Sequence, residues 1–561
     1  MFRKNSDCID LCKSLVRDIG GGMRRTIKLI LASFLLFTLS FLLFTNEARA
    51  NNIAVSNAFL GAQDTSAHTM VVQFDISWNN AWYDANNYDA AWVFIKYSTN
   101  SGTTWAHATL KVTDANNLTS GTGGVGNPTG FSCGTATYSG SSTNVSIDVP
   151  TEATSGKKGA FVHLSAAVTG SGTNTLTATG LQFVWDYGTD IGTSSANDVT
   201  AAAAIIRVMA IEMVYIPTGS FYVGSGGTES GSFTAGSWVS GATIPFQISS
   251  ENQLTINTGN VAYLWGTSTS GNNTIGSSGT LPAAFPKGYN AFYMMKYKIS
   301  QKQYADFLNT LTSGQAASYY PSYNGNYRYT ISGSWPNYSA SRPDRACNYL
   351  AWSDLYAYTD WAALRPMTEL EFEKACRGTA APVANEYAWG FSDSPTVTAV
   401  AATTIFGTTE DGTEIITNAG ANSCFGSQVY TGGDATGQSD TSPYPYTRGP
   451  LRCGIFATGS STTRKASGAS YYGVMELSGG LWERPVTVAA AAAFTGVHGD
   501  GDITTAPSNW PSSSTAAGAG FRGGNWVDAA TYARTSDRYY AADTDAYRIT
   551  DYGGRCVRTS P

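Results

Sequence analysis

The sequence predicts two regions of different fold class: an all-β sandwich of the immunoglobulin-like kind over residues 51–208, and an α+β region with short helices and many loops over residues 209–561. Two observations lead to this division. In the first region apolar and polar residues alternate, as in strands that bury one face. In the second, three short stretches carry apolar residues at helical spacing between long Gly-Ser-Thr loops. The length of 561 residues is ample for two or more domains.

The strands of the first region follow from period-two patterns bounded by Gly, Ser, Asn and Thr clusters. In 69–78, Met70, Val72 and Phe74 alternate with Gln73 and Asp75, which places one face in a core. Short strands with turn-rich connections favour an antiparallel sandwich. The predicted strands are 69–78, 91–97, 105–112, 145–149, 160–168 and 181–187.

The helices of the second region are predicted over 300–311, 353–362 and 368–376. Ser300 is a suitable N-cap for the first helix. Thr368 is a suitable N-cap for the third, and Glu371, three residues later, completes a capping box.

The N-terminal stretch 1–50 has the order of a secretory signal peptide. Met23 is followed by basic residues, an apolar run over 29–44 and the sequence Ala48-Arg49-Ala50, so that translation starting at Met23 and cleavage after Ala50 would yield an exported protein. The apolar run is short of the roughly 20 residues of a spanning helix, so no transmembrane span is expected after cleavage. We expect a secreted, periplasmic or cell-surface location.

Composition excludes several function classes. Charged residues make up 13% of the chain and the net charge is −6, which argues against nucleic acid as a partner. The four histidines lie far apart in sequence, so a metal centre built on clustered imidazoles is not expected. Cleavage would leave six cysteines without a C-x-x-C pair; buried thiols and one or two disulfides both remain open.

Several motifs in the second region carry a family resemblance. They occur in this order: 213–221 (MVYIPTGSF) with Gly224, 299–304 (ISQKQY), 347–354 (CNYLAWSD), 364–378 (LRPMTELEFEKACRG), 472–483 (YGVMELSGGLWE), 521–526 (FRGGNW) and 553–558 (GGRCVR). Together they resemble the formylglycine-generating enzyme (sulfatase-modifying factor) family. The resemblance implies a C-type-lectin-like fold over about residues 212–558. Fold does not by itself imply activity.

The motif residues also have a structural interpretation. Arg365, Glu369 and Glu373 can form ion pairs with one another or with Arg522 and Arg555 in the closing motifs. Four tryptophans can fill the core between loops, namely Trp352, Trp361, Trp482 and Trp526.

The resemblance implies an oxidase that uses a copper-binding cysteine pair just after the Arg-Gly-Gly motif, but the corresponding stretch 526–534 contains no cysteine. Without thiolates there is neither a soft copper site nor a nucleophile. Iron-dependent relatives need a histidine-rich site, and no histidine lies between His163 and His498. No cofactor and no catalytic residue is therefore predicted, and copper is not expected. Calcium stays open, because the family's asparagine near Gly480 is missing while Glu483 is present.

The stretch 527–552, here called the C-terminal segment, contains five Tyr and five Asp among small residues, a composition typical of binding surfaces. It also resembles the diversified stretch of lectin-fold variable proteins of diversity-generating retroelements, in which asparagine codons are randomised at adenines. Lys, Glu, Gln, Met and Trp cannot arise that way, and none occurs in the segment. The candidate ligand-binding residues are Val527, Asp528, Tyr532, Tyr539, Tyr540, Asp543, Asp545, Tyr547, Thr550, Asp551 and Tyr552; Arg534, Asp537, Arg538 and Arg548 are interpreted as scaffold.

The sequence thus predicts an exported, non-catalytic protein that binds a protein or glycan on an external surface through this segment. Two alternatives stay open. One is an oxidoreductase of the sulfatase-modifying type with unidentified ligands, and the other is a structural or adhesive surface protein.

Overall fold

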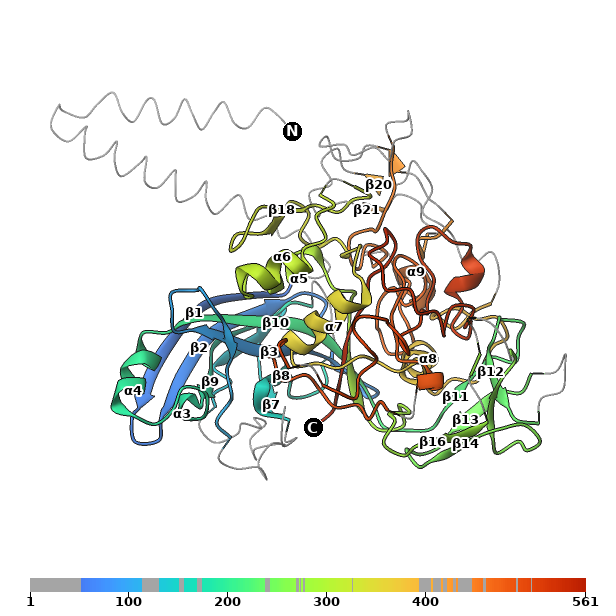
Figure 1. Ribbon diagram of the computed structural model, residues 1–561, viewed down its shortest axis with the longest axis horizontal. Helices are drawn as coiled ribbons and strands as arrows, with labels where there is room; N and C mark the ends of the chain where they lie inside the picture. The colour runs from blue at the N-terminus through green and yellow to red at the C-terminus, as the bar shows by residue number, and fades with distance from the viewer. Residues whose placement is uncertain are drawn as a thin grey trace. The chain divides into compact units, whose positions relative to one another are not determined.

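The computed structural model describes residues 52–561 except 113–130, 151–155, 169–173, 238–242, 269–271, 273, 276–277, 325, 393–404, 407–414, 417–420, 427–429, 432–445, 458–460, 491–492 and 506. The predicted signal peptide at 1–50 lies outside the described residues. The described chain is mostly β-structure with a few short helices, and its C-terminal part, red in Figure 1, consists mainly of loops.

One sheet has five strands, in the order β1-β2-β9-β5-β6. The long strand β2 pairs antiparallel with both β1 and β9. The strand bounds are β1 Ala54–Asp64, β2 Thr69–Trp78, β9 Leu176–Trp185, β5 Thr135–Tyr138 and β6 Ser141–Thr143.

A second sheet joins the two predicted regions. Its order is β24-β17-β10-β3-β8-β7, with β4 paired to β3. Strand β10 pairs with β3 from Ile205 to Val214 and with β17 from Met213 to Ile216, so the predicted boundary at residue 208 falls within this strand. The bounds are β24 Val557–Thr559, β17 Phe292–Met295, β10 Ile205–Ile216, β3 Asp89–Ser98, β8 Ala160–Leu164, β7 Val145–Asp148 and β4 Ala106–His107.

Alternation along β3 gives this second sheet two buried faces. Val93 and Ile95 pack with residues of β2 and β9 between the two sheets. Trp92 and Phe94 point the other way and pack with the helices of the second region. The second sheet therefore belongs to both cores, which places the two regions in one compact unit, residues 49–561.

The main helices follow the predicted caps. Ser300 caps α5 (Gln301–Leu308), and Thr368 caps α8 (Glu369–Arg377) in a capping box with Glu371, as expected. The bounds of the others are α3 Tyr187–Asp190, α4 Ser195–Ala202, α6 Ser313–Tyr319, α7 Trp352–Trp361 and α9 Arg464–Ser467. Short 3-10 turns lie at Gly156–Lys158, Val488–Ala490 and Ala530–Ala533.

The remaining strands form small sheets within the second region. Strand β11 (Phe221–Val223) pairs with β13 (Phe246–Ile248). A four-stranded sheet has the order β12-β15-β14-β16, with bounds Phe233–Ala235, Leu264–Gly266, Leu254–Ile256 and Gly279–Leu281. Two-residue pairs are β18 (Ile331–Ser332) with β19 (Ser339–Ala340), β20 (Ile405–Phe406) with β21 (Ile415–Ile416), and β22 (Tyr430–Thr431) with β23 (Tyr446–Thr447).

The strand expected over 105–112 is wrong beyond its first residues, because only Ala106–His107 is a strand. The chain changes sheets here. The Ala108 amide donates to the Ile95 carbonyl in β3, whereas the Lys111 amide donates to the Val184 carbonyl in β9. A stretch that crosses between two sheets shows an apolar pattern without being one strand.

No helix among the described residues is long and apolar enough to cross a membrane.

Candidate functional site

Buried ion pairs fix the backbone that leads into the C-terminal segment. The Arg522 guanidinium donates to Glu369 at 3.0 Å and to Glu373 at 2.7 Å, and all three side chains are fully buried. These two of the predicted pairs are confirmed. Arg365 pairs instead with Glu371 at 2.6 Å, and Arg555 with Glu483 at 2.7 Å.

Two arginines of the segment itself are part of this scaffold. Arg538 is fully buried and donates to Glu369 through Nε at 2.7 Å and Nη2 at 2.9 Å. Arg548 donates to the buried Asp354 at 2.6 Å. Because a buried charge is costly unless it is paired, both arginines have to turn inward. They anchor the segment at two points on α7 and α8.

Tyr532, Tyr539 and Tyr540, here called the tyrosine cluster, lie on both sides of the Arg538 anchor in the sequence. Their ring centroids are 4.6 Å apart for Tyr539 and Tyr540, 5.2 Å for Tyr532 and Tyr539, and 5.7 Å for Tyr532 and Tyr540. The Trp482 ring lies beneath them, 5.7 Å from Tyr540 and only 4% exposed. Tyr539 is 42% exposed, so the cluster presents aromatic surface to solvent on a rigid base.

Two aspartates lie beside the tyrosine cluster and share one amide. The Asn525 side chain donates to Asp528 at 3.0 Å and also to Asp551. Burial and the nearby Asp528 raise the pKa of Asp551 to about 6. Burial also raises the pKa of Asp528. Asp551 is only 8% exposed and serves the local structure, whereas Asp528 is half-buried at the edge of the cluster.

The second half of the segment forms a polar rim. The Asp543 carboxylate accepts hydrogen bonds from Asn272 and from the Asp545 amide. The Asp545 carboxylate accepts from the Tyr547 amide at 2.8 Å and from the Tyr552 hydroxyl at 2.9 Å. Tyr547 is 76% exposed, a large aromatic side chain standing in solvent.

The structure therefore brings together most of the predicted site residues. The ring centroids of Tyr552 and Phe521 are 4.6 Å apart, and those of Phe521 and Trp482 are 5.9 Å apart. These contacts connect the rim to Trp482, on which the tyrosine cluster packs. Val527 instead packs against a neighbouring hydrophobic core. Thr550 is half-buried, and its carbonyl accepts from Asn348 and Trp526, which is a structural role.

Sequence reasoning missed three residues of this surface: Trp482, Phe521 and Asn525. All lie in motifs that were given a structural interpretation, and all are buried at 4% exposure or less. Their part is to support the exposed tyrosines and aspartates from below. A buried aromatic residue gives no signal in the sequence that shows which surface it supports.

The thiols of the described chain are buried and away from solvent. Six cysteines, from Cys133 to Cys556, are buried. Burial raises the pKa of Cys556 to about 12, so its thiolate is strongly disfavoured. In the described part of the chain, no group of three or more His, Cys, Asp or Glu side chains is placed to hold a metal ion.

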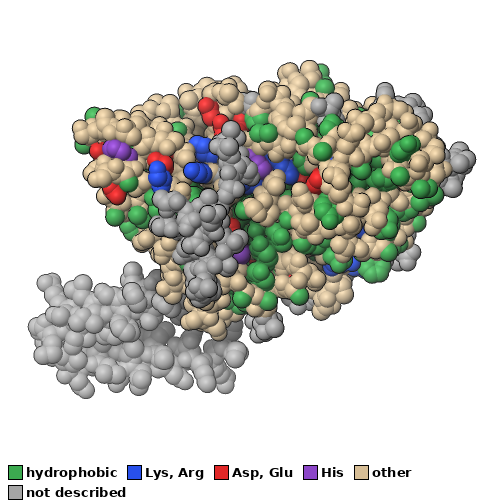
Figure 2. All heavy atoms as spheres, turned by 90° about the horizontal axis from the view of Figure 1, so that it is seen from below, with side chains coloured by type: hydrophobic (Ala, Val, Ile, Leu, Met, Phe, Trp, Pro, Cys, Tyr) green, Lys and Arg blue, Asp and Glu red, His purple; other side chains and the backbone are tan. Residues whose placement is uncertain are grey.

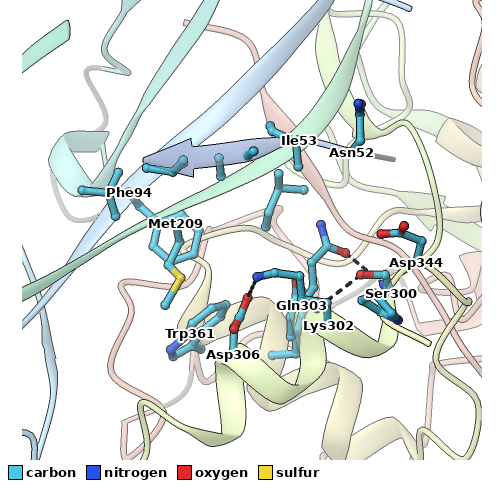
Figure 3. Close-up of a pocket in the computed structure, with 17 residues that line it drawn as sticks. Asn52, Ile53, Phe94, Met209, Ser300, Lys302, Gln303, Asp306, Asp344 and Trp361 are labelled. Atoms are coloured by element: carbon cyan, nitrogen blue, oxygen red, sulfur yellow. Dashed lines mark hydrogen bonds and ion pairs between the residues drawn. The ribbon is translucent and has the colours of Figure 1, made fainter. Parts of the chain in front are cut away.

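A separate cleft lies between β1, β10 and α5 (Figure 3). Its volume is about 460 Å³, and Phe94, Met209 and Trp361 supply apolar lining. Lys302 and Asp306 on its helical wall pair with each other. None of the predicted site residues lines this cleft. Charged side chains are also sparse on the face of the molecule shown in Figure 2.

Comparisons with known proteins bear on the family. The sequence model of one protein family, described as the sulfatase-modifying factor enzyme 1-like domain, matches residues 202–560 of this chain. Among solved structures, the chain is similar to Treponema denticola variable protein 1, at 12% sequence identity and a TM-score of 0.29, covering 63% of this chain and 96% of that one. Comparison with curated protein sequences gives no match.

Proposed function

The chain belongs to the sulfatase-modifying factor enzyme 1-like family, and from this premise we propose that it is an exported, non-catalytic ligand-binding protein. Its binding surface is the tyrosine cluster with the polar rim, and its ligand is a protein or glycan on an external surface. The sheets of the first region form an immunoglobulin-like sandwich that carries this surface. The protein is released from its signal peptide and needs no cofactor for binding.

One observation carries the proposal: solvent-exposed aromatic side chains stand on a base held by fully buried ion pairs. Tyr540 packs on Trp482 and Tyr539 packs on Tyr540, while Arg538 ties the adjoining backbone to Glu369. A rigid aromatic surface loses little conformational entropy on binding, which favours affinity. The absence of cysteine from 526–534 supports the non-catalytic part of the proposal.

The experiment that tests this function is a footprint of a bound ligand. Binders are selected from a displayed peptide library with the protein of residues 51–561, and amide hydrogen exchange is measured with and without the best binder. We expect slowed exchange within 527–552. Protection confined to the cleft beside α5, or to the five-stranded sheet, would contradict the assignment of the surface.

We further propose that the segment is diversified by a retroelement. Its composition supports this, because residues 527–552 contain no Lys, Glu, Gln, Met or Trp, the residues that randomised asparagine codons cannot encode. The direction of the side chains also supports it, since Arg538 and Arg548 are bound inward while Tyr539 and Tyr547 are exposed. Sequencing the 3′ end of the gene from many cells of one population should show substitutions confined to codons of the segment, with a near-copy repeat nearby. An invariant segment without a repeat would refute diversification and leave the binding function untouched.

A further inference from the structure

The charge of the binding surface is set by which side chains turn outward. Of the three arginines in the segment, Arg538 is bound to Glu369 and Arg548 to Asp354, and both of these carboxylates are fully buried. Arg534 is half-buried and donates to Asn385 at 3.3 Å. The segment contains no lysine. Its basic groups are therefore used within the protein and contribute little positive potential to the surface.

Arg484, just after the tryptophan motif, is also turned inward. It is 1% exposed, and its guanidinium lies 3.9 Å from the Phe521 ring centroid, on the buried side of the aromatic base. It donates to the carbonyls of Ala519 and Asp545 rather than to a carboxylate. It thereby holds the backbone of the polar rim in place.

The acidic groups of the same surface stay at its edge. Asp528, Asp543 and Asp545 are half-buried and are hydrogen-bonded to amides or to a tyrosine hydroxyl. In the described part of the chain none of the three forms a salt bridge with an arginine or lysine. In the sequence, Asp528 precedes the tyrosine cluster and Asp543 follows it. Both carboxylates act electrostatically on the Tyr540 hydroxyl, which they help to keep protonated. The surface is aromatic in its centre and negative at its edge.

We propose that this surface selects a protein partner that presents arginine or lysine side chains to the tyrosine cluster. The inference rests on the proposed function and names the partner class of the same site. A guanidinium or ammonium group is attracted to the face of an aromatic ring and donates hydrogen bonds to carboxylates, so one cationic side chain uses both features at once. An acidic partner would meet like charge, which costs affinity and slows association.

The test uses the same displayed peptide library as the only probe. Peptides are selected on the protein of residues 51–561 and compared with the unselected library, and the affinity of each retained peptide is then measured for the wild type and for the Y539A/Y540A variant. We expect enrichment of Arg and Lys and depletion of Asp and Glu. Raising NaCl from about 0.1 M to about 1 M, which shortens the Debye length from about 10 Å to about 3 Å, should weaken the selected peptides about tenfold or more.

A matched pair of variants isolates the carboxylates. D543N/D545N keeps one acceptor oxygen on each rim side chain and removes two charges; we expect a three- to tenfold loss of affinity for the selected peptides, roughly what exposed charge pairs contribute. D64N/D84N is the control, because Asp64 and Asp84 also accept backbone hydrogen bonds two and three residues on but lie in the first region. That control should change affinity less than about twofold.

The outcomes separate the two proposals. Tyrosine-dependent peptides that are cationic and sensitive to D543N/D545N support both. Tyrosine-dependent peptides that are neutral or acidic, and insensitive to salt, overturn the cationic partner and leave the binding function standing. Peptides that bind the Y539A/Y540A variant equally well overturn both.

Discussion

Replacing Glu369 by Gln should destabilise the protein strongly, because one carboxylate holds two buried arginines. Glu369 accepts from Arg522 at 3.0 Å and from Arg538 at 2.7 Å and 2.9 Å, and also from the Val488 amide at 2.7 Å. In E369Q the amide nitrogen faces a guanidinium donor, so at least one of these bonds is lost and both cations stay buried without this counter-charge. Breaking a buried ion pair by removing one partner costs about 3–5 kcal/mol.

The pH dependence of this loss has a defined sign. Burial raises the pKa of Glu369, but Arg538 and then Arg522 outweigh burial and hold it below its ordinary value. A carboxyl group whose pKa is lower in the folded state stabilises the folded protein at pH values above its unfolded pKa of about 4.3. This stabilisation is lost as the pH falls through the pKa of the folded state. The difference between wild type and E369Q should therefore be largest near neutral pH and shrink in acid.

The measurement is urea unfolding at 25 °C, followed by the fluorescence of the 14 tryptophans. K302Q is the control, since Lys302 and Asp306 form an exposed pair on α5, at 60% and 34% side-chain exposure, and should cost less than about 1 kcal/mol. A loss below about 1 kcal/mol for E369Q at neutral pH would refute the reasoning that this network anchors the segment.

D551N should equal the wild type in stability near pH 4 and exceed it by about 1–2 kcal/mol at pH 7.5. The reason is the raised pKa of Asp551, about 6, because of which the folded wild type loses stability as the pH rises toward that value. Urea unfolding at both pH values checks this. Four buried cysteines should resist a thiol reagent in the native protein and react fully in denaturant, because burial raises their pKa values: Cys347, Cys376, Cys453 and Cys556. Mass spectrometry of the labelled protein measures this. Fast labelling of these cysteines in the native protein would contradict the prediction. Purified protein should bind copper and iron at well below one equivalent and consume no oxygen on a cysteine-containing peptide, whereas stoichiometric metal with oxygen uptake would favour an oxidoreductase.

Elements with a strong local signal could be predicted from the sequence. The alternation of Met70, Val72 and Phe74 located β2, and the spacing from Ser300 located α5 with its cap. Such elements bury one face, and the burial shows in the sequence. The capping boxes are equally local, because their partners lie three residues apart.

Elements without a one-sided face were missed. Strand β1 is mostly exposed on both faces, so its sequence AVSNAFLGAQD has no alternation to detect. Strand β10 was divided between two regions because its first half packs on the sandwich core and its second half belongs to the family motif. Pairing between distant strands leaves no mark on either strand alone.

The candidate site was predictable in composition but not in geometry. The sequence placed Tyr539, Tyr540 and Asp543 in one segment and assigned Arg538 to the scaffold, where its buried ion pair with Glu369 now places it. That Trp482 supports the tyrosines, and that Asp551 is buried, depends on contacts between segments far apart in the chain.

The most direct test of the central claim is the affinity of one selected ligand for Y539A/Y540A beside that for Y323A. Tyr323 is 37% exposed and lies outside the C-terminal segment, so it controls for the loss of an exposed tyrosine in general. If the tyrosine cluster is the centre of the binding surface, the double variant should lose about tenfold or more in affinity, while Y323A changes less than about twofold. Equal affinity of the folded double variant and the wild type would contradict the account.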